Sequence, residues 1–392
     1  MPRALVVGGG VAGPAVAQLL TQVGWEAPVF EARSAPDPYG GLFLNVAVNG
    51  QRVLESLGVR ERLLSDAHPA SRMVMWSGRG KELGVVPNGP ADRPSEGGVI
   101  VRRGWLHDVV REGAERAGVR IHHGRRLARV EERAGTVAAV FEDGSVEEGD
   151  ILIGADGVGS VVRRHVAPDV VPEFTGLLGT GGFAQVPGLE PTPDVQHFIF
   201  GARSFFGYLV RDDGTAYWFA NLTADTPPAP DTPVTGDKLL ARLRDLHRDD
   251  PAPVPQLLAH TTGPLGGYPI FRLPTVPTWS RGRVVAMGDA VHATSPSAGQ
   301  GASLALEDAV VLATCLHTGR APAEAFASYE TARRERAERV VAHAANIDKQ
   351  KRVTKGRVGI AIRDAMLPMF LRKVAGDTRH DWIYDFRAPW PA

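Results

Sequence analysis

The sequence of 392 residues contains a single cysteine, Cys315, which excludes an intramolecular disulfide and a metal cluster held by several thiolates. It contains no apolar run of about 18 residues, so a transmembrane helix is not expected. The apolar stretch near the N-terminus is short and interrupted by three glycines, and it does not fit a signal peptide. We therefore expect a cytoplasmic protein with no membrane partner.

An excess of charge of either sign is also absent, because Lys+Arg and Asp+Glu each number 44. No net positive field is available to attract nucleic acid or an anionic membrane. The composition, 43% hydrophobic and 22% charged, is that of a globular protein long enough for two domains. We expect a monomer or a weak homo-oligomer that does not bind nucleic acid.

The first motif is the glycine turn GGGVAG at residues 8–13. It lies between a buried strand expected at residues 4–7 and a helix expected at about 13–23, and a second strand is expected at 27–31. The glycines of such a unit allow a tight turn, close approach of a pyrophosphate, and close packing of the helix on the strand. The acid that ends the second strand is placed to bind ribose hydroxyls, although a solvated strand-end acid is the alternative. The predicted dinucleotide-binding residues are Gly8, Gly10, Val11, Ala12, Gly13 and Glu31.

Two later apolar strands also end in an acid beside glycine. One is DILIGADG, which places Asp156 after its strand, and the other is GRVVAMGD, which places Gly288 and Asp289 after its strand. A loop rich in small residues then leads into a helix that begins near Ala302. Such a helix directs backbone N–H groups and a positive dipole end at a ligand. The three strand ends are therefore predicted to converge on one ligand.

With these three motifs the sequence resembles the group A FAD-dependent aromatic hydroxylases of the para-hydroxybenzoate hydroxylase type, which include tetracycline-inactivating oxygenases. The resemblance covers residues 3–308. It implies that FAD is bound, that NADPH or NADH reduces it transiently, and that O₂ then forms a flavin C4a-hydroperoxide that hydroxylates an aromatic small molecule, such as a natural product or antibiotic. It also implies that Asp289 binds the ribityl chain and that Arg103 lies along the FAD. The loop beside the flavin ring would be formed by Pro296, Gly299, Gln300 and Gly301.

The sequence departs from the family in two places. Residues 37–41 read DPYGG where many relatives have an arginine before the glycines, which puts the nicotinamide contacts in doubt. Ser303 stands where most relatives have asparagine. This change removes one side-chain contact to the flavin, which backbone donors are expected to replace.

The expected fold is α/β. A Rossmann-like FAD-binding domain of the glutathione-reductase type would comprise residues 1–70, 98–172 and 273–320. A mostly antiparallel substrate-binding sheet would comprise residues 71–97 and 173–272, where short aromatic runs alternate with Pro, Gly and Asp. Residues 321–392 would form a C-terminal helical segment.

The substrate sheet contains a predicted hairpin whose turn, Arg211-Asp212-Asp213-Gly214, places glycine in the left-handed position. With Arg211 facing Thr215, the aromatic residues separate into two faces. Trp218 lies on one face. The other face is predicted to line the substrate pocket, with Gly207 leaving room for a flat ligand. The candidate substrate residues are Phe205, Gly207, Tyr217 and Phe219, and the alternative is that these aromatics only form core.

No catalytic triad or protein nucleophile is expected, because the flavin would carry the chemistry. His292 has no second ligand at metal-binding spacing, which favours a packed histidine and no metal. Within the same fold, epoxidation and Baeyer–Villiger oxygenation remain alternatives, and a non-catalytic FAD-binding redox protein is the alternative from another class. A flavin-dependent halogenase is disfavoured because no two tryptophans stand two residues apart.

Overall fold

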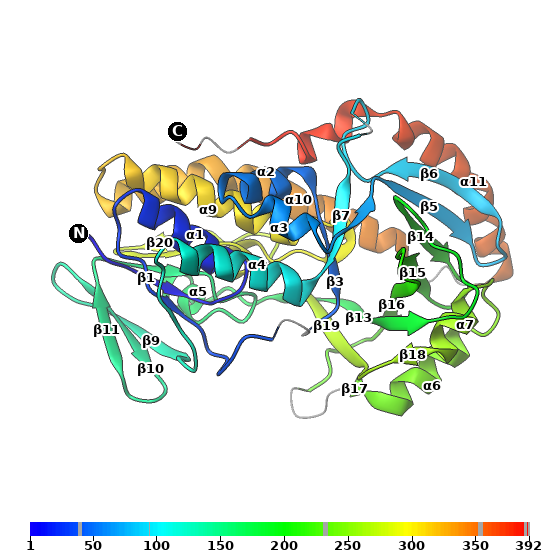
Figure 1. Cartoon of the computed structure of the whole chain (residues 1–392), viewed down its shortest axis with the longest axis horizontal. Coiled ribbons are helices and arrows are strands. Elements are labelled where there is room, and N and C mark those ends of the chain that lie inside the picture. The colour runs from blue at the N-terminus through cyan, green and yellow to red at the C-terminus, as the bar shows by residue number, and fades with distance from the viewer. Residues whose placement is uncertain (38–40, 94, 230–233, 352–355, 388–389, 391–392) are drawn as a thin grey trace.

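The computed structural model describes residues 1–37, 41–93, 95–229, 234–351, 356–387 and 390. One half of the molecule is built on a six-stranded sheet (Figure 1). Its five successive strands from β21 to β8 are parallel, and β20 adds an antiparallel edge. In order across the sheet the strands are β20 (Ser280–Arg281), β21 (Val284–Ala286), β12 (Ile151–Gly154), β1 (Ala4–Val7), β2 (Val29–Phe30) and β8 (Ile121–His122). The central strands are apolar throughout because both faces of the sheet are covered.

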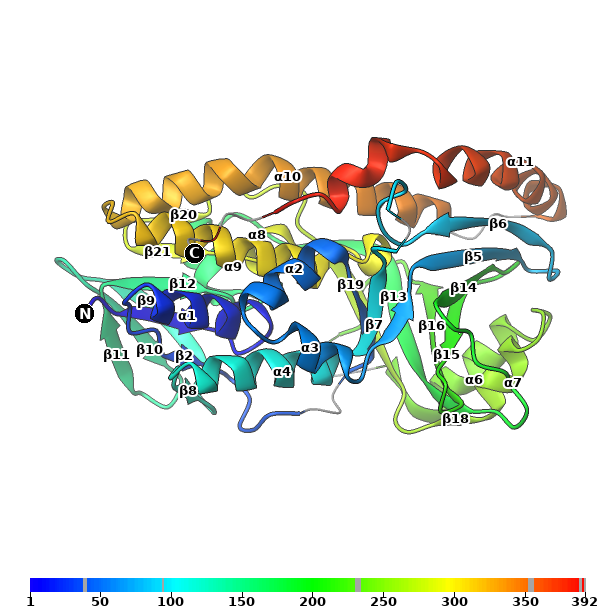
Figure 2. The same cartoon turned by 45° about the horizontal axis from the view of Figure 1, so that its top comes forward.

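Helices cover this sheet side by side (Figure 2): α4 packs against α1, α1 against α9, and α9 against α10. The long ones are α1 (Ala12–Gln22), α4 (Arg103–Arg116), α9 (Gly301–His317) and α10 (Pro322–Lys351), and the short ones are α2 (Val48–Ser56), α3 (Arg60–Leu64), α5 (Val161–Val166), α8 (Asp289–His292) and the 3-10 helix η1 (Pro296–Ala298). An antiparallel sheet of β9 (Leu127–Glu132), β10 (Val137–Phe141) and β11 (Val146–Gly149) flanks them. Together these elements enclose one large apolar core.

The other half is a large sheet that is antiparallel except where β14 pairs with β5. Its strands are β17 (Val234–Thr235), β19 (Gly266–Arg272), β13 (Glu173–Gln185), β16 (Thr215–Thr223), β15 (Phe205–Val210), β14 (Val195–Phe200), β5 (Arg72–Ser77), β6 (Glu82–Pro87) and β18 (Thr261–Thr262). One face packs on α6 (Gly236–Leu246) and α7 (Val254–Ala259). A small sheet of β3 (Phe43–Val46), β7 (Gly98–Arg102) and β4 (His68–Ala70) lies between the two halves (Figure 1).

The expected α/β class and the inserted antiparallel sheet are confirmed, and so is the hairpin register. Gly207 pairs with Phe219 and Tyr208 with Trp218, and Gly214 has φ +77°. Residues 48–64 form two helices, α2 and α3, because Gly58 between them has φ +67° and ends the first helix.

The C-terminal segment is helical, as expected. After α10 it forms α11 (Arg357–Ala375) and the 3-10 helix η2 (Thr378–Ile383). Gly356, which has φ +80°, precedes α11, and Pro368 lies inside it. Among the described helices, none combines the length and the apolar character needed to cross a bilayer.

Candidate functional site

Four neighbouring strands of the parallel sheet carry the candidate residues at their carboxyl ends. In the order β21, β12, β1 and β2, these ends lead to Asp289, Asp156, Gly8 and Glu31. Because the strands are parallel and adjacent, their carboxyl ends share one edge of the sheet. Residues from four distant parts of the sequence are therefore brought together.

Three of the four glycines of the turn after β1 have clearly different surroundings. At Gly8, which has φ +109°, an added Cβ would lie 2.3 Å from the carbonyl oxygen of Ala155. At Gly13 it would lie 1.8 Å from the carbonyl oxygen of Gly8, so α1 packs too closely on the turn for any side chain. At Gly10 no atom lies within 4 Å of such a Cβ. Gly10 therefore leaves open space at the start of α1, beside its N-cap Val11 and its first residue Ala12, where a diphosphate can approach a helix N-terminus.

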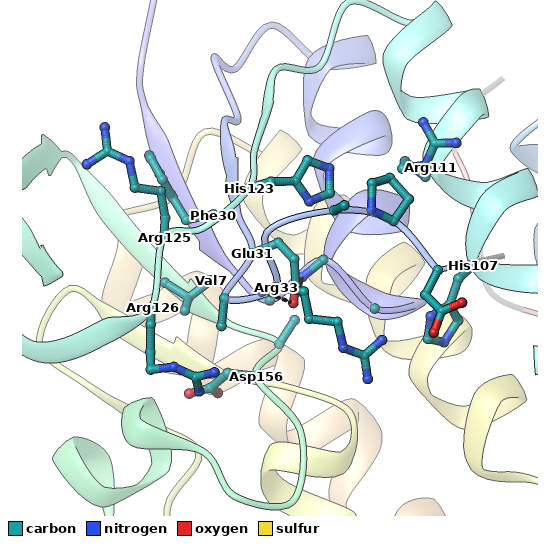
Figure 3. A pocket seen from close by; sticks show the side chains of 18 of the residues that line it. Val7, Phe30, Glu31, Arg33, His107, Arg111, His123, Arg125, Arg126 and Asp156 are labelled. Atoms are coloured by element: carbon teal, nitrogen blue, oxygen red, sulfur yellow. Dashed lines mark hydrogen bonds between the residues drawn. The ribbon is translucent and has the colours of Figure 1, made fainter. Parts of the chain in front are cut away.

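The carboxylate of Glu31 is held by backbone N–H groups on both sides (Figure 3). Gly9 donates to Oε2 at 2.6 Å and Arg33 donates to Oε1 at 2.8 Å. These bonds fix the acid at the end of β2, against the glycine turn. Each carboxylate oxygen has a second lone pair, so the group can still accept hydrogen bonds from ribose hydroxyls.

A cleft of about 380 Å³ extends from the glycine turn between Glu31 and α4 (Figure 3). Arg103 lies on its wall as the first residue of α4, and arginines outnumber acids in the lining by five to four. The arginines are Arg33, Arg103, Arg111, Arg125 and Arg126, and the acids are Glu31, Asp37, Asp108 and Asp156. His107 of α4 also lines the cleft, where burial and the charges of Arg103 and Arg33 lower its pKa to about 4, so it is neutral at pH 7. The open space at Gly10, the ribose acceptor and the arginines fit the adenosine and diphosphate portion of FAD.

Asp156 borders the cleft but has a structural task. Its carboxylate accepts hydrogen bonds from the hydroxyl of Ser160 at 2.5 Å and from the backbone N–H groups of Val161 and Val162 at 2.7 and 3.1 Å. It thus caps the N-terminus of α5. Burial raises the pKa of Asp156, and these hydrogen bonds oppose that effect.

Gly288 and Asp289 form the turn from β21 into α8. Gly288 has φ +61°, and a Cβ there would meet the Cβ of Ala305 on α9 at 3.3 Å and that of Ala12 on α1 at 3.6 Å. Asp289 is solvent-accessible, yet protein surrounds it on most sides, which raises its pKa, whereas the charges of His292 and Arg103 act in the opposite direction. Asp289, the first residue of α8, thus presents its carboxylate beside the point where the turn passes close to α1 and α9.

The loop before α9 is held by two asparagines. Asn45 donates to the carbonyl oxygen of Gly299 at 3.2 Å, and Gly299 has φ +62°. Asn49 donates to Oε1 of the fully buried Gln300 at 3.0 Å, and the Nε2 of Gln300 has no hydrogen-bond partner. Pro296 begins η1 and Gly301 begins α9. The loop and the unpaired amide thus frame the positive end of a 17-residue helix.

Ser303, the departure from the asparagine that the resemblance implies, is fully buried and points toward the start of α2. Its hydroxyl accepts a hydrogen bond from the N–H of Ala47 at 3.2 Å, and a Cβ at Gly50 would lie 2.5 Å from it. A larger residue would collide with α2, so the serine allows α2 and α9 to pack closely. The other departure, at residues 37–41, lies partly outside the described residues.

A buried charge network behind the site was not predicted. Arg333 of α10 pairs with Glu307 and Asp308 of α9, each at 2.7 Å, and all three side chains are fully buried. The Nε2 of His292 lies 2.6 Å from Oδ2 of Asp308. The same oxygen accepts a hydrogen bond from the N–H of Gly288 at 2.9 Å. Burial alone would lower the pKa of His292, but Asp308 raises it above the ordinary value. No metal-binding group of His, Cys, Asp and Glu occurs among the described residues, and His292 here belongs to an ion-pair network.

The two faces of the β15–β16 hairpin have different neighbours. Trp218 is fully buried on the face that packs on α6 and α7, and its ring stacks on that of Phe206 with 5.4 Å between the ring centres. Tyr217 and Phe219 point to the other side, toward the FAD-binding half, where their ring centres lie 5.3 and 6.1 Å from that of Phe43 on β3. The ring centre of Phe205 lies 5.9 Å from that of Phe219.

The room expected at Gly207 is not available. A Cβ there would lie 2.3 Å from the Phe219 ring, because this ring folds across its partner residue on the neighbouring strand. The glycine therefore accommodates Phe219, and the expectation that it leaves space for a flat ligand was wrong. The large aromatic residue opposite a strand glycine is the signal that could have shown this.

Comparisons with known proteins identify relatives over nearly the whole chain. Residues 2–344 match the model of a family described as FAD binding domain. The chain is 30% identical to 6-hydroxynicotinate 3-monooxygenase of Pseudomonas fluorescens, covering 86% of this chain and 89% of that protein. It is 32% identical to 3-amino-4-hydroxybenzoate 2-monooxygenase of Streptomyces cremeus, covering 84% and 83%. The crystal structure of Klebsiella pneumoniae HpxO with FAD and uric acid matches with a TM-score of 0.83 at 25% identity, covering 98% of this chain and 97% of that chain.

Proposed function

The chain belongs to the FAD binding domain family, and from this premise we propose that it is a single-component FAD-dependent monooxygenase that uses NAD(P)H and O₂ to hydroxylate an aromatic small molecule in the cytoplasm. One observation carries the proposal. The glycine turn, Glu31, Asp156 and Asp289 follow four adjacent parallel strands and meet at one edge of the sheet. That edge is where α/β sheets bind dinucleotides.

Bound FAD would supply the redox chemistry, by accepting hydride from NAD(P)H and activating O₂. The residues of the chain would bind and orient it. Glu31 would accept hydrogen bonds from the ribose, Gly10 would admit the diphosphate, and Asp289 would accept hydrogen bonds from the ribityl hydroxyls. The positive end of α9 would stabilise negative charge on the flavin ring by about 0.3–1 kcal/mol, or up to about 2 where partly buried.

We expect Glu31→Ala and Asp289→Ala each to weaken FAD binding, because each removes a charged acceptor of hydrogen bonds worth roughly 1.5–3 kcal/mol each. FAD affinity would be measured by titrating apoprotein and following flavin fluorescence. Glu55→Ala, which removes an exposed acid on α2, is the control and should bind like the original protein. Unchanged affinity in both site variants would show that the nucleotide lies elsewhere.

The reaction itself is tested by adding phenolic and heteroaromatic compounds to the FAD-loaded protein with NADPH or NADH. We expect one of these compounds to accelerate NAD(P)H oxidation and to gain one oxygen atom by mass spectrometry, because hydroxylation inserts a single atom of O₂. Comparing the two reductants also decides the nicotinamide preference. If no aromatic compound accelerates oxidation or gains oxygen, the proposal of an aromatic hydroxylase is wrong.

Epoxidation, Baeyer–Villiger oxygenation and a non-catalytic flavoprotein were the alternatives from the sequence. The two relatives named above are monooxygenases of aromatic compounds, and nothing in the described part of the site favours an alternative. The same screen identifies a non-catalytic protein, which gives no product. NMR spectroscopy of the product separates the three oxygenations, because the new oxygen lies in a hydroxyl group, an epoxide ring or an ester.

A further inference from the structure

The C-terminal helix α11 exposes an apolar surface. Ten large apolar side chains are strongly exposed among the residues that the structure describes, and half of them lie on this one helix. Val358 and Met369 are 74% and 71% exposed. The apolar surface, called here the α11 stripe, consists of Val358, Ile362, Met366, Met369 and Phe370. This concentration is unusual, because single exposed apolar residues are normally scattered over a protein surface.

The spacing of the α11 stripe places it along one side of the helix, since its residues recur every three or four positions. A different side of α11 is covered. Leu367, Leu371 and Val374 pack with Met75, Leu83 and Val86 of β5 and β6, at the outer edge of the molecule (Figures 1 and 2). The helix thus has two apolar sides, and the described part of the chain covers only one of them.

Positive charge borders the α11 stripe. Arg357 at one end of the helix and Arg372 and Lys373 at the other are exposed. The only acid between residues 357 and 373 is Asp364, which pairs with Arg363 at 2.8 Å. Of the six lysines in the sequence, four fall between residues 349 and 373. The zero net charge of the whole chain therefore conceals a local basic region.

We infer that α11 docks the protein on the surface of an anionic lipid bilayer, with the α11 stripe at the boundary between headgroups and acyl chains and the basic residues at the headgroups. An exposed apolar helix side bordered by Lys and Arg is the pattern of interfacial helices, and anionic headgroups attract such residues. This inference replaces the expectation of no membrane partner, which rested on the net charge and on the lack of a transmembrane run or signal peptide, and it does not depend on the reaction.

Charge disfavours a second copy of the chain as the occupant of the α11 stripe. In a parallel pairing of two α11 helices Arg357 would face Arg357, and in an antiparallel pairing it would face Arg372 and Lys373. Like charges meet in both arrangements, and such contacts oppose association.

The test is co-sedimentation of the FAD-loaded full-length protein with phosphatidylcholine vesicles, with and without phosphatidylglycerol. We expect binding only to the vesicles that contain phosphatidylglycerol, and weaker binding as salt is raised. The double variants I362E/M366E and R372E/K373E should each bind at least about tenfold more weakly, since one loses the apolar contact and the other reverses two charges. The control V171E removes an apolar residue, 75% exposed, outside the helix and should bind like the original protein.

Flavin absorbance and circular dichroism show whether each variant is folded. Equal binding to vesicles without phosphatidylglycerol would overturn the inference, and so would unchanged binding of both double variants or an equal loss in V171E. A dimer that I362E/M366E abolishes, in a protein that does not bind vesicles, would assign the α11 stripe to a second copy and also overturn it.

Discussion

Replacing Arg333 with methionine is expected to destabilise the protein by about 3–5 kcal/mol, the usual cost of removing one partner of a buried ion pair. Arg333 is fully buried and contacts Glu307 and Asp308, each at 2.7 Å. Methionine retains much of the apolar stem of the arginine, but the buried carboxylates of Glu307 and Asp308 lose the positive charge that pairs with both. Arg336 still pairs with Glu307 at 2.8 Å and His292 with Asp308 at 2.6 Å, so part of the network remains. Denaturant unfolding of the FAD-loaded protein measures the loss.

The matched control is Arg116→Met. Arg116 is 59% exposed and lies 3.7 Å from Glu112 on the same helix, a pairing worth about 0.3–0.5 kcal/mol. A loss for Arg333→Met no larger than for this control would contradict the role given to the buried network.

The same variant should also bind FAD more weakly. Asp308 accepts the hydrogen bond from the N–H of Gly288, so it holds the turn that carries Asp289. Without Arg333, Asp308 loses the partner that fixes its other oxygen, and the turn is less firmly positioned. A variant that is destabilised yet keeps its FAD affinity would show that the network supports the fold but does not position the site.

The meeting of the glycine turn, Glu31, Asp156 and Asp289 at one edge of the sheet could be predicted from the sequence, because local residue chemistry specifies it. A glycine turn after an apolar strand, with an acid at the end of the next strand, is typical of a dinucleotide site, and the resemblance to FAD-dependent hydroxylases is confirmed. The hairpin register was predictable for a similar reason. Its turn residues determine which residues pair, and the side-chain alternation of two determines which share a face.

The charge network and the packing at Gly207 depend on contacts that no local pattern contains. Arg333 lies 25 residues from Asp308, on a different helix, and periodicity does not reveal which sides of two helices meet. The two apolar sides of α11 cannot be told apart in the sequence, because only the packing of Leu371 on β5 and β6 shows which side is covered and which is exposed. Such features require the tertiary arrangement.

In the β15–β16 hairpin, Phe219→Ala is expected to uncouple NAD(P)H oxidation from hydroxylation while leaving the FAD content unchanged. The Phe219 ring lies near Phe43 and fills the space over Gly207, so its removal opens a gap on the side that faces the FAD-binding half. We propose that this side lines the substrate site, where a gap would admit water and loosen the substrate. The hydrogen peroxide released per NAD(P)H consumed should rise and the product per NAD(P)H should fall, and Tyr217→Ala should act in the same direction.

The control for Phe219→Ala is Trp218→Ala on the opposite side of the same strand. Trp218 is fully buried against Phe206, so its truncation should cost about 3–5 kcal/mol of stability through the cavity that it leaves. Its ratio of peroxide to product should change little at temperatures where the variant stays folded, because its ring faces α6 and α7. If Trp218→Ala raises peroxide release while Phe219→Ala and Tyr217→Ala do not, the substrate lies on the Phe206 and Tyr208 side of the hairpin, and the pocket assignment is reversed.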